Sequence, residues 1–534
     1  MAPFWGSRLV WIDSVCINQK DPLDKNQQVA LMSKIYQQAT RTLAWLGDSP
    51  TAEYAVLQLY RLQPAVMNNQ KWTEVLEMMK QKVLGTDTPP NWSALSELLS
   101  HQYWTRVWIV QELAVSKDVY IIYGTHYIPL GTISEAAHVL TCILNEYNKG
   151  EHFQMKYGFE RANHRIRPLQ KIDQRILNLL NIRIISGFRE LIQKGQYPEL
   201  WRAVVVTYLF DATDPRDKIY AFYNIATYST ETGLKADYTI SVNDVYTRFT
   251  KHYISAQFQN LFFAAGNCRP RQLHGLPSWV PDFTSSNSLQ LPFLGGGQDL
   301  KDGYTASGEH HQATIAPDSS NEIRLRGVYV DTVTHLTLHA IEPSGDEVRQ
   351  PLISPAVHAW HEEAVSLVLA NIPQNYRYYE ESRRQAFIRT LIEDRNSDGS
   401  EAQRVYAKYY KHWCHFLKLS ADSGPKALEL PTSNEPAEKK QAAEIFASAV
   451  LRAGKFRRFA ITREGYMALV PKEVEVGDVV WVVAGLQVPV VLRPIGIDMA
   501  TKERVYTLVG WCYCHGIMMG EAVKSGEFEN FILR

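Results

Sequence analysis

The stretch of sequence that decides the fold lies near the N-terminus and reads Val10-Trp11-Ile12-Asp13-Ser14-Val15-Cys16-Ile17-Asn18-Gln19. Residues 8–12 are mostly apolar and end at Asp13, which predicts a short buried strand followed by a loop. Apolar residues then recur at helical spacing over 24–40, and 42–46 reads as a second strand that Gly47 ends. The order strand, loop, helix, strand is the repeating unit of a parallel α/β sheet.

A third strand follows a helical segment. We predict a helix that extends into 104–116 and then a strand at 118–123. Because βα units place successive strands in parallel, we expect 8–12, 42–46 and 118–123 to lie side by side in one sheet. The N-terminal part is therefore predicted to be an α/β domain with a mostly parallel sheet and helical insertions.

The pattern of the chain changes along its length, which predicts several parts. Helical patterns dominate the middle, and an irregular stretch rich in Pro and Gly begins near residue 260. Alternating valines and a Gly477-Asp478 turn predict a compact β-rich unit over 456–523. We predict five parts: an α/β domain at 1–145, a helical and irregular extension at 146–300, a mixed β and helical region at 301–420, a mobile linker at 421–440 and a β-rich C-terminal unit at 441–534.

The composition of the chain excludes several classes of protein. Lys plus Arg and Asp plus Glu balance at 56 each, so no net positive charge points to nucleic acid. The six cysteines are mostly isolated, which suits a reducing compartment. The most apolar run, 479–492, is too short for a spanning helix and is broken by Gly485 and Pro489. We therefore expect a cytoplasmic protein with no nucleic-acid partner and no membrane span.

Two sequence patterns approach metal sites without completing one. Cys512, Cys514 and His515 lie close together, but structural zinc needs four ligands and no second pair lies nearby in the sequence. His361 is followed by Glu362, yet the order is not that of the His-Glu-x-x-His zinc motif. Packing roles are favoured for these side chains, and we predict no metal and no cofactor.

Three segments of the chain together resemble the heterokaryon incompatibility (HET) domain family of fungi. They are residues 10–19, Arg106-Val107-Trp108-Ile109-Val110-Gln111-Glu112-Leu113, and Asp214-Pro215-Arg216-Asp217-Lys218-Ile219-Tyr220. The core of the resemblance covers about residues 8–124, and landmarks at 276–282 and 510–521 extend it over most of the chain. The first segment is too long and specific to match by chance.

The start of the chain departs from the family pattern. HET domains normally open with a strand reading Ala-Leu-Ser-Tyr-x-Trp-Gly well before the Trp-Ile-Asp strand, whereas here only Phe4-Trp5-Gly6 precedes that strand. We therefore expect an N-terminally truncated domain that lacks the first strand and helix of the family.

The HET core is more distantly similar to Toll/interleukin-1 receptor (TIR) domains, which implies a TIR-like α/β fold. The segment 108–113 has the shape of a TIR helix motif whose glutamate is catalytic in members that cleave NAD. The resemblance thus implies a catalytic Glu112 with NAD as substrate. Such a carboxylate would stabilise the oxocarbenium-like centre that departing nicotinamide leaves.

Four further residues are expected to bind the ligand. Trp108 stands four residues before Glu112 and so shares its helix face. Asp13 ends the predicted first strand, and Asn18 and Gln19 follow in the next loop. Ligands gather at such strand ends in open α/β sheets, so these side chains are expected to meet at one edge.

Structural explanations compete with each of these roles. Glu112 could pair with Arg106 or Lys117, and the tryptophan one turn earlier could belong to the core. An Asx turn explains Asn18 equally well. For residues 214–217 a helix start with a structural ion pair is favoured over a place in a site.

The resemblance predicts a self/non-self recognition protein that mediates programmed cell death. Its HET domain would self-associate when a protein partner is sensed, so the expected partners are proteins, including further copies of the chain. An NAD-cleaving enzyme that uses Glu112 and a truncated paralogue without activity are the two alternatives. The missing first strand favours signalling over catalysis.

Overall fold

The computed structural model divides into two compact units, Met1–Val245 and Tyr246–Arg534. It describes residues 9–62, 92–148, 177–227, 235–255, 265, 271–284, 303–308, 321–342, 352, 354–376, 378, 381–395, 402, 404–422 and 437–534. The predicted boundaries at 145, 300, 420 and 440 are finer than this division and stay predictions. Phe4-Trp5-Gly6 and residues 423–436 of the expected linker lie outside the described residues.

The N-terminal unit opens with two helices, α1 (Asp13–Cys16) and α2 (Pro22–Gln38). The side chain of Asp21 accepts hydrogen bonds from two backbone N–H groups of the first turn of α2, and Pro22 occupies that turn. Both features favour a helix start at this point. The helix predicted at 24–40 is therefore confirmed, with its start two residues earlier.

The strand predicted at 8–12 is wrong. Residues 9–12 belong to no strand, and the backbone N–H of Cys16 donates to the carbonyl of Ile12 at 2.8 Å as the chain turns into α1. Leu9 is fully exposed and Ile12 is 48% exposed. An apolar run forms a buried strand only where a neighbouring strand and a covering layer receive it. The described part of the unit provides neither for this run.

Within the described residues, the sheet of the N-terminal unit has three strands in the order β1 (Thr42–Trp45), β2 (Val119–Tyr123) and β3 (His126–Pro129). β1 and β2 are parallel, so the predicted pairing of 42–46 with 118–123 is confirmed. β2 and β3 form an antiparallel hairpin whose turn contains a left-handed glycine.

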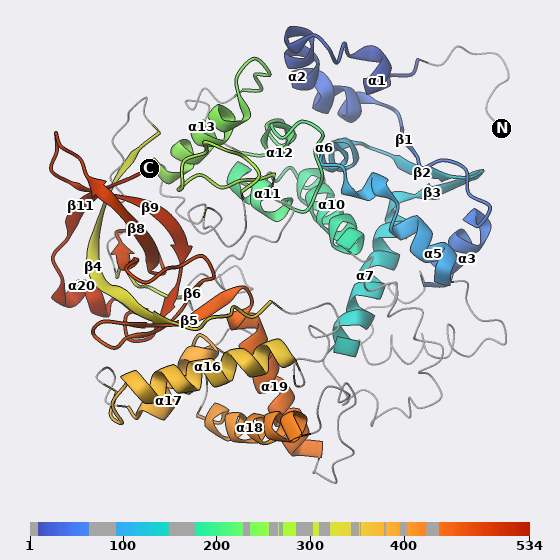
Figure 1. The fold of residues 1–534 in the computed structure, drawn as a ribbon. Helices are drawn as coiled ribbons and strands as arrows, with labels where there is room; N and C mark the ends of the chain where they lie inside the picture. Colours follow the sequence, from blue (N-terminus) through green and yellow to red (C-terminus); the bar gives the residue numbers. More distant parts are fainter. Residues whose placement is uncertain are drawn as a thin grey trace. The chain divides into compact units, whose positions relative to one another are not determined.

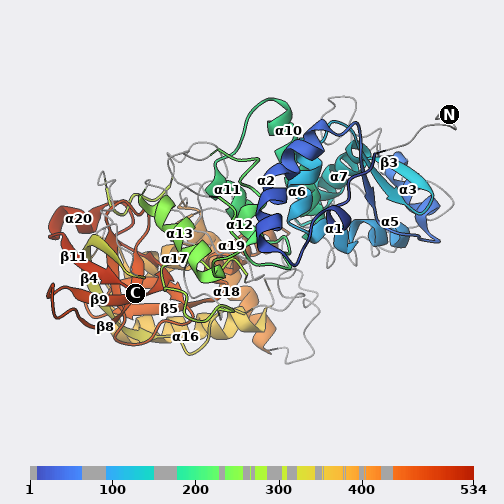
Figure 2. The same cartoon turned by 90° about the horizontal axis from the view of Figure 1, so that it is seen from above.

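Helices make up most of the rest of this unit (Figure 1). They are α3 (Ala52–Leu62), α5 (Trp92–Leu99), the 3-10 helix η3 (Gln102–Thr105), α6 (Trp108–Val115), α7 (Leu130–Asn148), α10 (Leu177–Gln193), α11 (Leu200–Val206) and α12 (Asp217–Tyr220), while α13 (Val242–Ser255) crosses the boundary between the units. The helix predicted at 104–116 is present as η3 and α6. Helix α6 packs against both α2 and α10, and Figure 2 shows it beside α2.

The C-terminal unit is built around an eight-stranded, barrel-like sheet. Its strands are β4 (Ile323–Leu336), β5 (Arg457–Thr462), β6 (Met467–Pro471), β7 (Val479–Val483), β8 (Val490–Ile497), β9 (Arg504–Trp511), β10 (Tyr513–Cys514) and β11 (Glu529–Leu533). The neighbour order is β10-β6-β5-β4-β11-β9-β8-β7, and β4 also pairs with β7, which closes part of the sheet on itself (Figure 1). The predicted strands within 456–523 are confirmed, and β4 and β11 complete the sheet from outside that range.

Strand β4 joins the two halves of this sheet. It pairs with β11, β7 and β5 in turn, and register shifts near Asp331 and Val333 let it bend between these partners. At Gly327 a Cβ atom would lie 2.7 Å from the carbonyl oxygen of Val482, so only glycine permits this close approach of β4 and β7.

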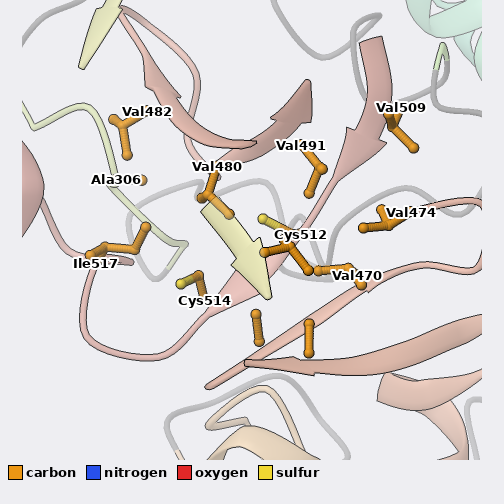
Figure 3. Packing of buried hydrophobic residues seen from close by; sticks show 13 residues of the cluster. Ala306, Val470, Val474, Val480, Val482, Val491, Val509, Cys512, Cys514 and Ile517 are labelled. Atoms are coloured by element: carbon orange, nitrogen blue, oxygen red, sulfur yellow. The ribbon is translucent and has the colours of Figure 1, made fainter. Parts of the chain in front are cut away.

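A hydrophobic core fills the barrel-like sheet (Figure 3). It consists of small and medium side chains, each no more than 3% exposed: Ala306, Val333, Ala460, Ala468, Val470, Val474, Val480, Val482, Val491, Val509, Cys512, Cys514 and Ile517. The helices of this unit are α16 (Pro355–Asn371), α17 (Arg383–Leu391), α18 (Tyr406–Asp422), α19 (Ala437–Gly454) and α20 (Glu521–Ser525). Of these, α16 packs on β5 and α17 on β6.

The predicted succession of an α/β start, a helical middle and a β-rich end is confirmed at this level. The TIR-like arrangement of the first unit stays a prediction. Over the ranges that the structure describes, every helix is too short or too polar to cross a membrane.

Candidate functional site

Helix α6 presents two of the predicted site residues one turn apart. Trp108 and Glu112 stand at positions i and i+4, which lie on the same side of a helix. Glu112 is 7% exposed, whereas Trp108 is half-buried. An ionisable side chain so deeply buried needs partners, because an unpaired buried charge is costly.

The partners of Glu112 come from α1, α2 and the residues just before α6. The hydroxyl of Tyr36 donates a hydrogen bond to its carboxylate, and Arg106 and Asp13 act on it electrostatically. Arg106 Nη2 lies 3.7 Å from Asp13 Oδ2. The same charges act on Tyr103. We call Asp13, Tyr36, Tyr103, Arg106 and Glu112 the Glu112 cluster.

Burial controls the protonation of this cluster. It raises the pKa of Glu112 to about 7, an effect that Arg106 opposes and Asp13 reinforces. Burial also raises the pKa of Tyr36 and of Tyr103 well above the usual range, so both phenols keep their protons, and Tyr36 uses its proton to donate to Glu112. A carboxyl group with a pKa near neutrality can accept or release a proton under cellular conditions.

The ring of Trp108 is anchored on a different element. Its indole N–H donates to the carboxylate of Asp217 in α12, and the hydroxyl of Tyr238 donates to the same carboxylate at 2.5 Å. Burial raises the pKa of Asp217. The two predicted residues of α6 are thus held by different segments, Trp108 by α12 and Glu112 by α2 and the residues around α1.

The segment 214–218 is held by an ion pair and hydrogen bonds, which fits the structural role favoured from the sequence. Asp214 accepts hydrogen bonds from the guanidinium of Arg216, with an ion pair of 2.8 Å, while Arg216 also donates to two backbone carbonyls. Lys218 is buried and donates to the carbonyls of Tyr208 and Phe210, and burial lowers its pKa to about 8. These contacts hold the segment to nearby residues of the chain, and an ion pair of 3.6 Å between Asp214 and Lys25 links it to α2.

The loop after α1 is occupied by local hydrogen bonds. Asn18 Oδ1 accepts from the backbone N–H of Lys20 at 3.2 Å, and the backbone N–H of Asn18 donates to Asp24 at 2.8 Å. The Asx turn that competed with a ligand role is therefore present. Asn18 and Gln19 are both exposed, and their ligand role stays a prediction.

Sequence reasoning placed Asp13 beside Glu112 and named Arg106 as a structural partner, and both relations are present. It missed Tyr36 and Tyr103. Tyr36 lies four residues after buried Met32 on α2, so its position reads as part of an apolar stripe. A tyrosine within an apolar stripe carries a hydroxyl that needs a hydrogen-bond partner once it is buried, and this feature could have identified Tyr36 from the sequence.

The predicted packing role of the C-terminal cysteines is consistent with their surroundings. Cys512 and Cys514 are both fully buried in the barrel core, and burial raises the pKa of both thiols. Where the structure describes the chain, no three His, Cys, Asp or Glu side chains are grouped so that they could hold a metal ion.

Comparisons with known proteins relate both ends of the chain to fungal proteins. Residues 4–112 match the family described as heterokaryon incompatibility protein (HET), and residues 380–534 match the family described as Het-6 beta-barrel domain. Heterokaryon incompatibility protein 6, OR allele, of Neurospora crassa is 23% identical over 607 aligned residues, which cover 98% of this chain and 83% of the relative. No solved structure matches the chain.

Proposed function

The chain is a fungal HET-domain protein, and on this premise we propose that it acts in heterokaryon incompatibility, as a self/non-self recognition protein whose HET domain triggers programmed cell death. The observation that carries the proposal is the length of the similarity. A relative whose name states this role aligns with 98% of the chain, and the family matches lie at both ends of that alignment.

The proposed mechanism is self-association of the N-terminal unit when a protein partner is sensed. The Glu112 cluster supports a functional site in this unit, because it concentrates charge at a junction of separate segments. Glu112 is buried, whereas Asp13 and Arg106 are 36% and 50% exposed and so connect it to the surface. A perturbed acid with such partners is a frequent mark of function. Glu112 is the residue on which we propose that the activity of this site depends. Asp13 and Trp108 are the residues that we propose bind a ligand beside it.

The test is inducible expression of the full chain in a filamentous fungus, alone and in fused cells of a strain with a divergent allele. We expect growth arrest and uptake of a vital dye in the fused cells. Glu112→Gln removes the carboxylate charge and should abolish killing at unchanged protein level. Glu190→Gln, at an exposed glutamate of the same unit, is the matched control and should kill like the wild type. Normal growth of all fusions at full expression would contradict the proposed function.

Nicotinamide release from NAD by the purified chain separates the two mechanisms. Killing without nicotinamide release supports self-association. Release that Glu112→Gln abolishes and Glu190→Gln leaves intact would replace it with the enzymatic alternative.

A further inference from the structure

The turn that follows α17 in the C-terminal unit holds two consecutive residues in a strained backbone conformation. Glu393 and Asp394 have φ angles of 56° and 52°, in the left-handed region that residues other than glycine rarely adopt. Such strain persists only where the surrounding contacts hold it, and it is concentrated at functional sites. The turn therefore directs attention to the side chains around it.

Arginine side chains hold the carboxylates of both strained residues. Glu393 forms ion pairs with Arg457 at 2.5 Å and with Arg452 at 3.3 Å. Asp394 accepts two hydrogen bonds from the guanidinium of Arg389, at 2.7 and 2.6 Å. Each of the two carboxylates is therefore already paired with an arginine from another part of the unit.

The next residue, Arg395, is a buried cation whose surroundings are different. It is 8% exposed, and its guanidinium lies over the ring of Tyr304, 4.5 Å from the ring centroid, and hydrogen bonds to the hydroxyl. Among the described residues, no carboxylate forms an ion pair with it. A contact with an aromatic ring offsets only part of the cost of removing a charge from water. This guanidinium therefore still needs a negative charge beside it.

The charged groups around the turn include one positive charge in excess. Arg389 also contacts Glu381 at 3.4 Å, and His515 hydrogen bonds to the same carboxylate. No side chain of the charged network is more than 36% exposed, so water screens the excess charge only in part. The network sets four guanidinium groups against three carboxylates: Arg389, Arg395, Arg452 and Arg457 against Glu381, Glu393 and Asp394.

The position of Arg395 is fixed by contacts of its backbone and of the ring below it. Its backbone N–H donates to the carbonyl of Ile392 at 3.2 Å, and its own carbonyl accepts from Arg452 at 3.4 Å. The hydroxyl of Tyr304 donates to the carbonyl of Glu393, which anchors the ring. A guanidinium held in this way is preorganised, so little conformational entropy is lost when it binds an anion.

We propose that the guanidinium of Arg395 binds a small oxyanion within the C-terminal unit. A guanidinium presents N–H donors in one plane, which matches two oxygen atoms on one centre, the shared chemistry of phosphate and carboxylate ligands. Tyr304 covers one face of that plane, and its hydroxyl cannot use all five N–H donors. The bound anion supplies the missing negative charge and thereby stabilises the fold of this unit.

The experiment is thermal unfolding of the purified full chain in chloride, phosphate, sulfate and acetate at equal ionic strength and pH. The transition that Trp481→Ala lowers belongs to the C-terminal unit. We expect an oxyanion to raise the midpoint of this transition by about 2 °C or more above its value in chloride, and to do so saturably. Phosphate and sulfate test a tetrahedral ligand, and acetate tests a planar carboxylate. A wild type that responds to no oxyanion overturns the proposal.

Variants of Arg395 assign the effect to this residue. Arg395→Gln removes the charge and should abolish the shift, whereas Arg463→Gln, at an exposed arginine of the same unit, is the matched control and should keep it. Arg395→Lys keeps the charge without the planar arrangement of donors, so the anion concentration at half the shift should rise about ten-fold. The lysine variant keeps the test decisive if the glutamine variant does not fold. A shift that is unchanged in the Arg395 variants, or that Arg463→Gln also abolishes, overturns the proposed site.

A carboxylate of the chain itself is the competing source of negative charge. Asp398 and Glu401 follow Arg395 closely in the sequence and lie outside the described residues. The double variant Asp398→Asn, Glu401→Gln removes both charges. An oxyanion shift of the same size in this variant and in the wild type supports a site for an external ligand. A shift that appears only in the double variant shows that the chain supplies the charge, and the proposed ligand is then wrong.

Discussion

Strands β1 and β7 each carry a tryptophan among apolar neighbours, yet one of these side chains is exposed and the other is buried. In β1 of the N-terminal unit, Trp45 is 69% exposed, whereas in β7 of the C-terminal unit Trp481 is fully buried. β7 lies between β8 and β4, which closes the barrel-like sheet, while β1 has a strand partner on one side only among the described residues. Closure of the sheet and a second covering layer, rather than the apolar character of the strand, therefore decide which tryptophan is buried.

The largest effect of a substitution on the free energy of unfolding is expected in β7, where the barrel-like sheet closes. Trp481→Ala should lower the free energy of unfolding by about 3–5 kcal/mol, the usual cost of emptying a large aromatic site in a core. The ring of Trp481 packs on Phe531 and Tyr506 with centroid distances of 4.7 and 5.7 Å. Urea titrations followed by circular dichroism measure the change. Trp45→Ala is the matched control and should cost less than about 1 kcal/mol; equal losses would contradict the comparison.

Ion pairs of the two units differ in burial in the same way as the two tryptophans do, with the buried example in the C-terminal unit. In the C-terminal unit Glu393 accepts from Arg457 at 2.5 Å and from Arg452 at 3.3 Å, and Glu393 and Arg457 are both almost fully buried. Glu393→Gln should cost about 3 kcal/mol, because it leaves a buried guanidinium without its counter-charge. The pair of Arg41 with Asp118 in the N-terminal unit is about half exposed. Asp118→Asn should cost at most about 1 kcal/mol in the same urea titrations, and a larger loss would show that this exposed pair is part of a covered surface.

The N-terminal unit should lose stability as pH rises toward neutrality. Burial raises the pKa of Glu112 from 4.5 to about 7, so the folded state holds a proton that the unfolded state has released. The resulting stability is complete below about pH 4.5 and is lost as pH rises through 7. Glu112→Gln should remove this loss, which amounts to about 3 kcal/mol. Burial also raises the pKa of Glu473 to about 7, so Glu473 lowers the stability over the same pH range. Glu473→Gln is the comparison variant, and the loss that remains in it is the part due to Glu112.

The C-terminal unit contains a histidine with the opposite dependence. Burial lowers the pKa of His361 from 6.5 to about 4, and its ring packs against Trp413 and hydrogen bonds to the hydroxyl of Tyr410. Its contribution is complete above about pH 6.5 and is lost as pH falls toward 4. His361→Gln should therefore flatten the acid side of the stability profile. The comparison fails if Glu112→Gln and His361→Gln flatten the same side.

Local sequence patterns predicted most helices and strands of both units. They did not predict which strands of the two sheets are paired on both sides and covered. The strands at 42–46 and 118–123 and the helix that carries Glu112 follow from periodicity over a few residues. The apolar run at 8–12 has the same composition as a buried strand, but over the described part of the unit residues 9–12 have no strand partner and no covering layer. Periodicity reports which side chains are apolar and carries no information on what covers them.

The closure of the barrel-like sheet depends on distant pairings. β4 precedes its partners β5 and β7 by more than a hundred residues, and no local pattern announces that pairing. The same limit applies to the Glu112 cluster, in which Tyr36 meets a carboxylate from a helix about 70 residues later. The chemistry of Glu112 could be named from the sequence, whereas its buried phenol partner required the fold.

The smallest effect on stability is expected on the exposed face of β1. Leu43→Thr exchanges an exposed leucine for a residue with high preference for strands, so the free energy of unfolding should change by no more than about 0.5 kcal/mol. Val480→Thr makes a similar exchange inside the closed sheet, where a hydroxyl would be fully buried, and should cost about 1–3 kcal/mol. Urea titrations at low protein concentration keep association from contributing. A loss of more than about 1 kcal/mol for Leu43→Thr would show that this face of β1 is already covered in the isolated chain. Such a result would remove the difference in exposure between β1 and β7 on which the comparison depends.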